Sequence, residues 1–402
     1  MHHVSFRKAA FALFTGSFVS FMILYIPQTL IPVFSSEFKV NPGTASLSLS
    51  LTSATLAISL LFAPLVSNKL GRKRLMILSL MMSSFLCILS AVSPTFIFFL
   101  IVRTLMGISL AGFPSIAMTY ISEEFPPKQV GIVMGLYVSG TTVGGLTGRV
   151  LTGVLTDIIS WHVTTLVIGL LSIFLSLLFW RYLPKETSHS IQAYSLNIFF
   201  TTLLSPFKRK ELRALYALSF LLMGSFVTIY NYIGYLLAAP PYFFSQTALG
   251  LLFLIYFVGT FSSTYAGTVA NSVGPRKVLL ICMLLMIGGL FLTTSSSLIL
   301  IIIALGILTF GFFGSHSIAS RLVGDYAVSN KAQASSLYLL FYYLGASIIG
   351  TSGGFVLTHN GWISLVLTLV FFIMIAFSVI LLFTKERTIV HHQKHSTVKA
   401  GR

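Results

Sequence analysis

Long apolar segments follow one another along this sequence and leave it few possible folds. There are twelve runs of about 20 mostly hydrophobic residues; 56% of the chain is hydrophobic and only 8% is charged. A soluble domain carries roughly 25% charged residues, whereas a helix of about 20 apolar residues can cross a bilayer. Backbone amides in lipid must pair within their own segment, and no run alternates as a barrel strand does. The sequence therefore predicts an all-α membrane protein with twelve transmembrane helices.

Polar turns separate the apolar segments, for example at Ser93-Pro94 and Asn360-Gly361. The first segment is too long for the core of a signal peptide and lacks a small-residue cleavage site, so we expect it to be retained. The expected spans cover residues 9–33, 44–68, 73–92, 95–120, 130–155, 161–182, 212–237, 246–271, 276–296, 299–322, 333–356 and 361–384.

The positive charge of the chain is placed asymmetrically. The formal net charge is +17, and alternate loops together with the two tails hold all but three of the 25 Lys and Arg residues. The exceptions are Lys39, in a loop on the other side, and Arg103 and Arg149, inside spans. This is the positive-inside pattern, which predicts that both termini are cytoplasmic. The charge therefore orients the chain in a membrane and does not indicate a nucleic-acid partner.

The chain divides into two similar halves at its longest polar interruption. We expect a six-helix bundle over 1–182, a cytoplasmic linker over 183–211, a second six-helix bundle over 212–384 and a basic tail over 385–402. Several residues recur at a nearly constant offset. Asn68 and Gly71 match Asn271 and Gly274 at 203, and at 201 Leu136-Tyr137 matches Leu337-Tyr338, Gly153 matches Gly354 and Trp161 matches Trp362. Such duplication is typical of transporters whose substrate site lies between the repeats, near the bilayer midplane.

The chemistry of enzymes and metal sites is missing from the spans. Cys87 and Cys282 lie in corresponding spans of different halves, so we expect neither a disulfide nor a metal site from them. No cluster of His, Cys and acidic residues has metal-site spacing, and no P-loop motif occurs. We therefore expect no cofactor.

Three motifs resemble those of the major facilitator superfamily, and the resemblance extends over essentially the whole chain. The family's loop after the second span reads Gly-x-x-x-Asp-Arg-x-Gly-Arg followed by two basic residues. Here the loop runs from Pro64 to Arg74, with Asn68 in place of the Asp. The resemblance implies that this loop closes the two halves together on the cytoplasmic face. The expected gating residues are Asn68, Gly71, Arg72, Lys73 and Arg74, with Gly274 and Arg276 in the second half.

The substitution at Asn68 predicts a weaker gate. Asn68 can accept an amide hydrogen bond at a helix N-terminus but brings no charge to its dipole. The alternative is that the basic cluster only fixes the topology of the chain.

The fourth and fifth spans carry the other two motifs. Arg103-x-x-x-Gly107 is similar to the family's Arg-x-x-x-Gly, and Gly140-Thr141-Thr-Val-Gly144-Gly145 resembles the antiporter signature Gly-Pro-x-x-Gly-Gly. Small residues at this spacing favour close helix packing, so we expect Gly107, Gly140, Gly144 and Gly145 to pack helices together. Within the family the chain is similar to bacterial efflux permeases for drugs and metabolites. This likeness implies the bacterial inner or plasma membrane and a chain that works as a monomer.

Polar side chains inside spans are costly in lipid and are candidates for lining a substrate path. Arg103 lies about eight residues into its span, roughly 12 Å deep, so it either faces a cavity or binds carbonyls of neighbouring helices. Arg149 is closer to the outer end of its span and either lines the path or snorkels to the surface. Tyr25 and Gln28, one turn apart in the first span, are further candidates.

The seventh span carries a polar stripe at helical spacing. Thr228, Asn231 and Tyr235 share one face, and Tyr232 lies beside it. We expect all four to line the path. For the two tyrosines, the alternative is a place in the interfacial aromatic belt.

No carboxylate lies deep in an expected span. The acids, which all occupy loops or helix ends, are Glu37, Glu123, Glu124, Asp157, Glu186, Glu211, Asp325 and Glu386. Many proton-coupled members of the family carry the proton on a buried acid, and that route is missing here. His316, in the tenth span, is the one side chain near the membrane interior that titrates near neutral pH in water. It is either a proton carrier or a group that packs or bonds the substrate.

The leading hypothesis is a secondary-active transporter that exports a small organic compound in exchange for protons by alternating access. The alternative is a facilitator or importer of a small organic anion on the same fold, favoured by the buried cations and the missing buried acids. An enzyme is not expected, because the spans hold no Ser-His-acid set. The expected partners are a small-molecule substrate, protons under the leading hypothesis, and the lipid bilayer.

Overall fold

A computed structural model describes residues 6–186, 201–327 and 330–384, and these residues form helices joined by short turns. The basic tail and much of the linker predicted between the halves lie outside this part of the chain. The helices are α1 (Phe6–Glu37), α2 (Pro42–Leu70), α3 (Arg72–Ala91), α4 (Phe96–Leu110), α5 (Pro114–Glu124), α6 (Pro127–Ile158), α7 (Trp161–Tyr182), η1 (Ser205–Lys208), α9 (Lys210–Ala238), α10 (Gln246–Leu251), η2 (Leu252–Ile255), α11 (Tyr256–Val273), α12 (Pro275–Leu292), α13 (Leu298–Tyr326) and α14 (Lys331–Phe383).

These helices give the twelve spans that the sequence predicts. Eleven helical stretches of the described residues are long and apolar enough to cross a membrane, with α4 joined to α5, and α10 joined through η2 to α11. The last stretch, α14, has 53 residues, and a straight helix of that length would span ~80 Å, over twice a bilayer core. The backbone turns inside α14 at Gly361, where φ is 77° and ψ is −178°. α14 therefore supplies two spans, and the predicted fold class is confirmed.

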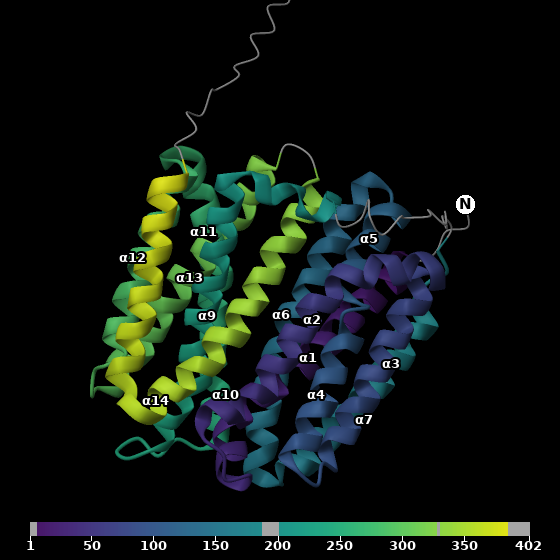
Figure 1. Ribbon diagram of the computed structural model, residues 1–402. Helices are drawn as coiled ribbons and strands as arrows, with labels where there is room; N and C mark the ends of the chain where they lie inside the picture. The colour runs from purple at the N-terminus through teal and green to yellow at the C-terminus, as the bar shows by residue number, and fades with distance from the viewer. Residues whose placement is uncertain (1–5, 187–200, 328–329, 385–402) are drawn as a thin grey trace, which may run out of the picture.

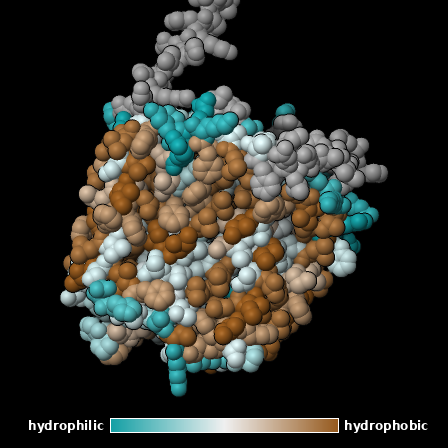
Figure 2. Space-filling view, in the orientation of Figure 1, coloured by the Kyte–Doolittle hydropathy of each residue, from teal (hydrophilic) through white to brown (hydrophobic). Residues whose placement is uncertain are grey.

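The helices form two bundles that lie side by side (Figure 1), α1 to α7 in one and α9 to α14 in the other. Each bundle has its own apolar core, because the buried residues fall into two clusters drawn almost wholly from one half or the other. The start of α1 and the end of α14 lie at the same end of the molecule, which we call the termini end (Figure 1). Hydrophilic residues gather at the two ends, and apolar side chains cover much of the surface between them (Figure 2).

The two bundles meet most closely at the opposite end, which we call the far end. There α2 packs against the first part of α14, and α6 packs against α10. A Cβ atom at Gly153 would lie 2.4 Å from the carbonyl oxygen of Gln246, and one at Gly354 would lie 2.4 Å from Cα of Gly43. Gly153 and Gly354 were predicted to be equivalent in the repeat. Both allow backbones of the two halves to touch, which confirms the duplication at the level of packing.

The turn after the second span of each half repeats as well. Gly71 has φ 88° and ψ 148°, and Gly274 has φ 101° and ψ 137°, a left-handed region that glycine adopts without steric cost. Lys73 then donates through Nζ to the carbonyl of Leu183, and Arg276 donates through Nη2 to the carbonyl of Leu381 at 2.6 Å. In each half, a basic residue after the turn thus binds the end of the last helix.

The bundles are less closely packed at the termini end. A Cβ atom at Gly131 or Gly135 of α6, or at Gly267 of α11, would meet no atom within 4 Å. At the far end Gly43, Gly153 and the other interface glycines meet backbone or side-chain atoms well inside that distance. Among the described residues, the close contacts between the halves therefore gather at the far end, which is closed.

Candidate functional site

A chain of three polar side chains joins the two halves in the membrane interior. Arg149 of α6 is only 4% exposed, and its Nε donates to Oε1 of Gln28 in α1 at 2.7 Å. Gln28 in turn donates through Nε2 to Oδ1 of Asn231 in α9 at 3.0 Å. Three residues that the sequence singled out separately thus form one chain from the first half to the second.

Aromatic rings surround the Arg149 guanidinium. Its Cζ lies 3.7 Å from the ring centroid of Tyr25, 4.8 Å from that of Phe253 and 5.0 Å from that of Tyr256. Such contacts stabilise a desolvated cation by about 2 kcal/mol or more. The rings come from both halves, so the cation is held between the bundles.

Arg149 does not extend toward the nearer end of α6. Its Nη1 donates to the carbonyl of Gly145 at 2.8 Å, one turn back toward the middle of the helix. The side chain therefore points into the bundle, and the snorkelling alternative does not describe its position. Gly145 makes room for this path, because its own Cβ position would lie 3.3 Å from both Nη1 and the Tyr25 ring.

The polar chain lies near the symmetry axis of the repeat. Gln28 and Asn231 are 203 residues apart, the same offset that relates Gly71 to Gly274. Two equivalent residues can bond each other only where the pseudo-twofold axis passes between them. Their neighbours repeat the pattern, since Thr29 donates to the carbonyl of Arg149 at 3.2 Å, and Tyr232 donates to the carbonyl of Gly350 at 2.6 Å.

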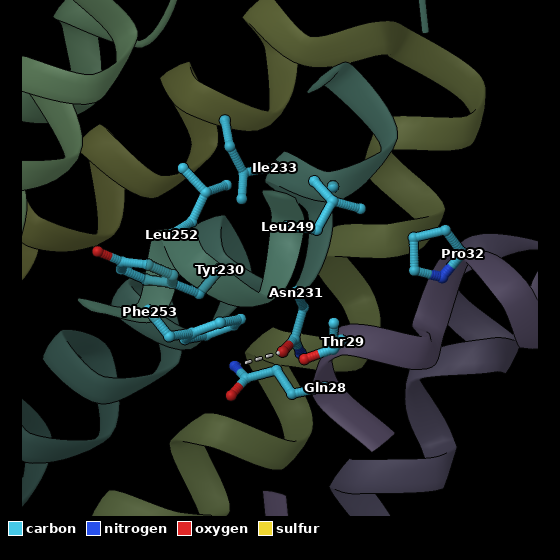
Figure 3. Close-up of a pocket in the computed structure, with 10 residues that line it drawn as sticks. Gln28, Thr29, Pro32, Tyr230, Asn231, Ile233, Leu249, Leu252 and Phe253 are labelled. Atoms are coloured by element: carbon cyan, nitrogen blue, oxygen red, sulfur yellow. Dashed lines mark hydrogen bonds between the residues drawn. The ribbon is translucent and has the colours of Figure 1, made fainter. Parts of the chain in front are cut away.

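A small cavity lies beside this chain (Figure 3). Its volume is about 10 Å³, room for about one water molecule. It is lined by Gln28, Thr29, Pro32, Tyr230, Asn231, Ile233, Gly234, Leu249, Leu252 and Phe253. A cavity this small cannot admit a solute, so the chain of polar groups is shielded on the side toward the far end.

The remaining α9 candidates pack at the interface of helices. Tyr232 is fully buried, which places it away from an aromatic belt at the surface. Tyr235 crosses to the other half and donates to the carbonyl of Ile31 at 3.1 Å. Thr228 is buried and bonds the carbonyl of Gly224 in its own helix at 2.6 Å. These residues surround Asn231 and hold α9 against α1 and α14.

Arg103 lies apart from this chain, among backbone carbonyls. Its Nε donates to the carbonyl of Ser48 at 2.9 Å, and its two terminal nitrogens donate to those of Ile23 and Leu24 at 3.3 and 3.0 Å. These contacts tie α4 to α1 and α2. They match the packing alternative left open by the sequence; a role of Arg103 in the path stays a prediction.

His316 lies in an aromatic cluster of the second half. Its Nδ1 is 3.0 Å from the hydroxyl of Tyr338, and its ring stacks on Phe312 with an interplanar angle of 7°. Tyr342 lies at 4.8 Å between ring centroids. His316 is therefore held by partners that fix its ring, and a role in proton transfer stays a prediction.

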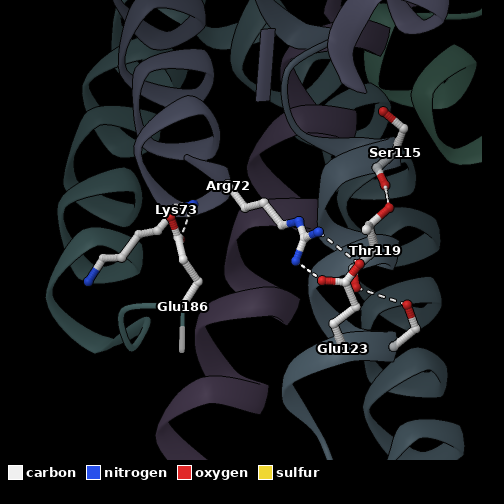
Figure 4. A network of polar contacts seen from close by, with 7 residues as sticks. Arg72, Lys73, Ser115, Thr119, Glu123 and Glu186 are labelled. Carbon is white, nitrogen blue, oxygen red and sulfur yellow. Dashed lines mark hydrogen bonds and ion pairs between the residues drawn. The ribbon is translucent and has the colours of Figure 1, made fainter. Parts of the chain in front are cut away.

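The gating residues lie at the termini end and contact their own half (Figure 4). Arg72 pairs with Glu123 of α5 through two hydrogen bonds, and the backbone amide of Lys73 donates to Glu186 at 2.8 Å. Asn68 is half-buried and Arg74 is exposed. A bond from the first-half gating residues, Asn68 to Arg74, to the second half is not among the contacts of the described residues.

The predicted packing glycines lie at close helix contacts. A Cβ at Gly107 would lie 2.1 Å from Oγ1 of Thr55, and one at Gly140 would lie 2.1 Å from Oγ of Ser17. At Gly144 it would lie 2.2 Å from the carbonyl oxygen of Phe18. The α1–α6 and α2–α4 contacts therefore depend on the absence of a side chain at these positions.

Sequence reasoning missed the aromatic residues that complete the site. Phe253 and Tyr256 lie against Arg149, and Tyr342 packs against the apolar clusters of both halves. The chain has 36 Phe and 16 Tyr, so a single ring carries no signal of its own. The break of the helix at η2, between α10 and α11, could not be predicted either, because it lies within an apolar run.

Comparison with known proteins places this architecture in a family. The sequence profile of the Major Facilitator Superfamily matches residues 13–244 and 215–400. The uncharacterised MFS-type transporter YybF of Bacillus subtilis (strain 168) is 40% identical over 371 residues, 92% of each chain. The inner membrane transport protein YnfM of Escherichia coli (strain K12) is 42% identical over 358 residues, 89% of this chain and 86% of YnfM.

A solved structure shares the fold. The nucleoside transporter NupG superposes with a TM-score of 0.77 at 16% identity, covering 94% of this chain and 100% of that one. The family and the relatives are transporters, which agrees with the expectation that the chain is not an enzyme. With the matches extending over both bundles, the chain belongs to the Major Facilitator Superfamily of membrane transporters.

Proposed function

We propose that this protein is a secondary-active transporter that moves a small organic compound by alternating access around Arg149. The single observation that carries the proposal is the Arg149–Gln28–Asn231 chain, which joins the halves at the repeat axis. Duplicated transporters of this kind rock their halves about a fixed site. Here the site is shielded toward the far end, where the close contacts between the halves gather.

We further propose that the termini end is cytoplasmic and that transport is export in exchange for protons. The positive-inside pattern of the loops supports the orientation. Export is supported by a likeness to the probable sugar efflux transporter of Helicobacter pylori (strain J99 / ATCC 700824), 26% identical over 271 residues. His316 is the candidate proton carrier, because the described acids lie at or beyond helix ends.

A second candidate function is a facilitator or importer of a small organic anion. It is favoured by one observation, the buried Arg149 cation, which has aromatic rings and an amide around it and no carboxylate partner among the described residues. Dissipation of a proton gradient when substrate is added to proteoliposomes separates the two candidates. Export by antiport requires it, and facilitation proceeds without it.

Alternating access is tested with two single-cysteine variants. Ser50 of α2 is 4% exposed, and its carbonyl accepts a bond from Ser347 of the other half at 2.7 Å. Thr142 is exposed on α6, two turns from Arg149 and on the same face. A membrane-impermeant maleimide is expected to label Thr142→Cys only from the termini side, and Ser50→Cys only from the far side, when the far end opens. The two native cysteines, Cys87 and Cys282, are buried, and labelling of the unsubstituted chain measures the background from them.

The outcome can contradict the proposal directly. A Ser50→Cys variant that is never labelled, under any substrate or proton gradient, would mean that the far end does not open. Labelling of both cysteines from one side of the membrane would refute the two-sided passage. Either result removes alternating access, whatever the substrate is.

The gate predicts a further shift in labelling. Asn68→Asp adds the charge that the family's loop motif normally carries. When the termini end closes, an anion there gains about 0.3–1 kcal/mol beside a helix N-terminus of the other half. The variant should shift the ratio of the two states toward closure of the termini end by up to about fivefold, which slows the labelling of Thr142→Cys. Asn360→Asp adds the same charge at an exposed position of the far end and is the matched control. An unchanged labelling rate for Asn68→Asp would leave the basic cluster with a topological role only.

A further inference from the structure

The polar chain at Arg149 ends in free hydrogen-bond donors. Arginine can only donate, so Gln28 must turn its oxygen to Arg149 and its nitrogen to Asn231. Asn231 therefore accepts through Oδ1, and its Nδ2 is buried without a partner. The Nη2 of Arg149 likewise has no bond within the described part of the chain. A buried donor without a partner, such as Nδ2 of Asn231, costs free energy, and Nη2 of Arg149 can still donate, so this layer is complementary to a ligand that brings acceptors.

The charge at this layer is also unbalanced. The nearest acid on the same helix is Asp157, whose two oxygens accept from the backbone amides of Gln246 and Thr247 at 3.0 and 2.7 Å. Asp157 is therefore bonded to the other half near the far end, two turns from Arg149. A buried cation without a carboxylate partner favours an anion and disfavours a second cation.

Flat rings extend from Arg149 into the second half. The Tyr256 ring, next to Arg149, lies 5.8 Å from the ring of Phe313. Phe313 lies 5.2 Å from Phe312, on which His316 stacks. Tyr256, Phe313 and His316 are each partly exposed. A ligand held at Arg149 would thus meet aromatic faces beside its charged group.

We propose that Arg149 binds the carboxylate of a small, flat organic anion whose ring packs against Tyr25 and Tyr256. One carboxylate oxygen accepts from Nη2 of Arg149, the donor that has no partner in the protein. The ring of the anion gains contact with the aromatic residues of both halves. This proposal rests on the proposed transport function and names its substrate class.

The test uses the purified full chain in detergent and four probes at constant ionic strength. Benzoate carries both the carboxylate and the ring, benzamide lacks the charge, benzylamine reverses it, and acetate lacks the ring. Affinity is read from the rise in Tm with probe concentration. Benzoate should bind at least about tenfold more tightly than benzamide, the worth of one charge-assisted hydrogen bond. Acetate should be weaker than benzoate, and benzylamine should not bind.

Two variants test whether benzoate binds at Arg149. Gln28→Glu is isosteric and places a carboxylate on Nε of Arg149, so it should lower benzoate affinity about tenfold while the fold is kept. Arg149→Gln removes the cation and should abolish the preference for benzoate over benzamide. Arg181→Gln removes an exposed arginine at the end of α7 and is the matched control for charge. It should keep the affinity of the original chain.

Several results would overturn the proposal. Equal binding of benzoate and benzamide, no binding of benzoate, or full benzoate affinity in both Gln28→Glu and Arg149→Gln would each exclude an anion site at Arg149. An equal Tm rise with sodium chloride would assign the effect to salt and would also exclude it. The labelling of Ser50→Cys and Thr142→Cys uses no ligand, so it tests alternating access independently of the anion site.

Discussion

Gly144→Ala is expected to destabilise the protein strongly, although it adds a single methyl group. The new Cβ would lie 2.2 Å from the carbonyl oxygen of Phe18 and 2.7 Å from its Cα, and both atoms belong to the backbone of α1. A backbone cannot turn aside as a side chain can, so the two helices must separate. Overpacking of this kind costs about 1–3 kcal/mol or more. The measurement is the Tm of the purified protein in detergent, together with the yield of folded protein from the membrane.

The repeat supplies a second test of the same contact. Gly345 is 201 residues after Gly144, and its Cβ would lie 2.0 Å from the carbonyl oxygen of Phe220 in α9. Gly345→Ala should therefore lower the Tm by a similar amount, through the equivalent helix pair of the other half. Similar losses would show that the duplication extends to the energetics of packing.

The control for this prediction has the opposite sign. Gly135 lies in the same helix as Gly144, and its Cβ would meet no atom within 4 Å. Alanine is better than glycine in a helix by about 1 kcal/mol, so Gly135→Ala should leave the Tm unchanged or raise it. If Gly135→Ala and Gly144→Ala lower the Tm equally, the loss does not arise from contact between α1 and α6.

The fold was accessible from the sequence because lipid removes most alternatives. Apolar length, the charge asymmetry of the loops and the repeat offset each act over many residues, so single deviations do not hide them. The first departure lies at Gly361, where the expected boundary between two spans is a sharp turn inside one continuous helical stretch. The breaks between α4 and α5 and at η2 were not predicted, because an apolar run has the same pattern whether or not the helix is interrupted.

The site was accessible only in part. Gln28 and Asn231 stood out because amides are costly in lipid, and their offset of 203 already matched that of the turns. That they bond each other follows only once the repeat axis is placed between them. The sequence left two interpretations of Arg149 open, lining the path or snorkelling, because depth along a helix does not give the direction of a flexible side chain. Its direction is set by Gly145 and by rings from the other half, which a linear sequence does not bring together.

Gly153→Ala is expected to shift the conformational equilibrium toward an open far end. Its Cβ would lie 2.4 Å from the carbonyl oxygen of Gln246 and 3.2 Å from Cα of Gly250, both in the other half. The clash exists only while the halves are closed there, so opening relieves it. A penalty of about 1–3 kcal/mol on the closed state changes the population ratio by about fivefold to over a hundredfold. Ser50→Cys should then be labelled about tenfold faster, and Thr142→Cys more slowly.

Gly354→Ala should act in the same direction, because its Cβ would lie 2.4 Å from Cα and N of Gly43, backbone atoms of the other half. The Tyr232 hydroxyl, also at 2.4 Å, lies in the same half as Gly354, and its flexible side chain must shift in both states. Gly306→Ala, with no atom within 4 Å of its Cβ, is the control and should leave both labelling rates unchanged. The two cysteines must respond in opposite senses, since alternating access opens one end as it closes the other. Faster labelling at both positions would instead indicate that the bundles have come apart. Unchanged labelling in Gly153→Ala and Gly354→Ala would mean that these contacts persist throughout the cycle, and the far end would then need another gate.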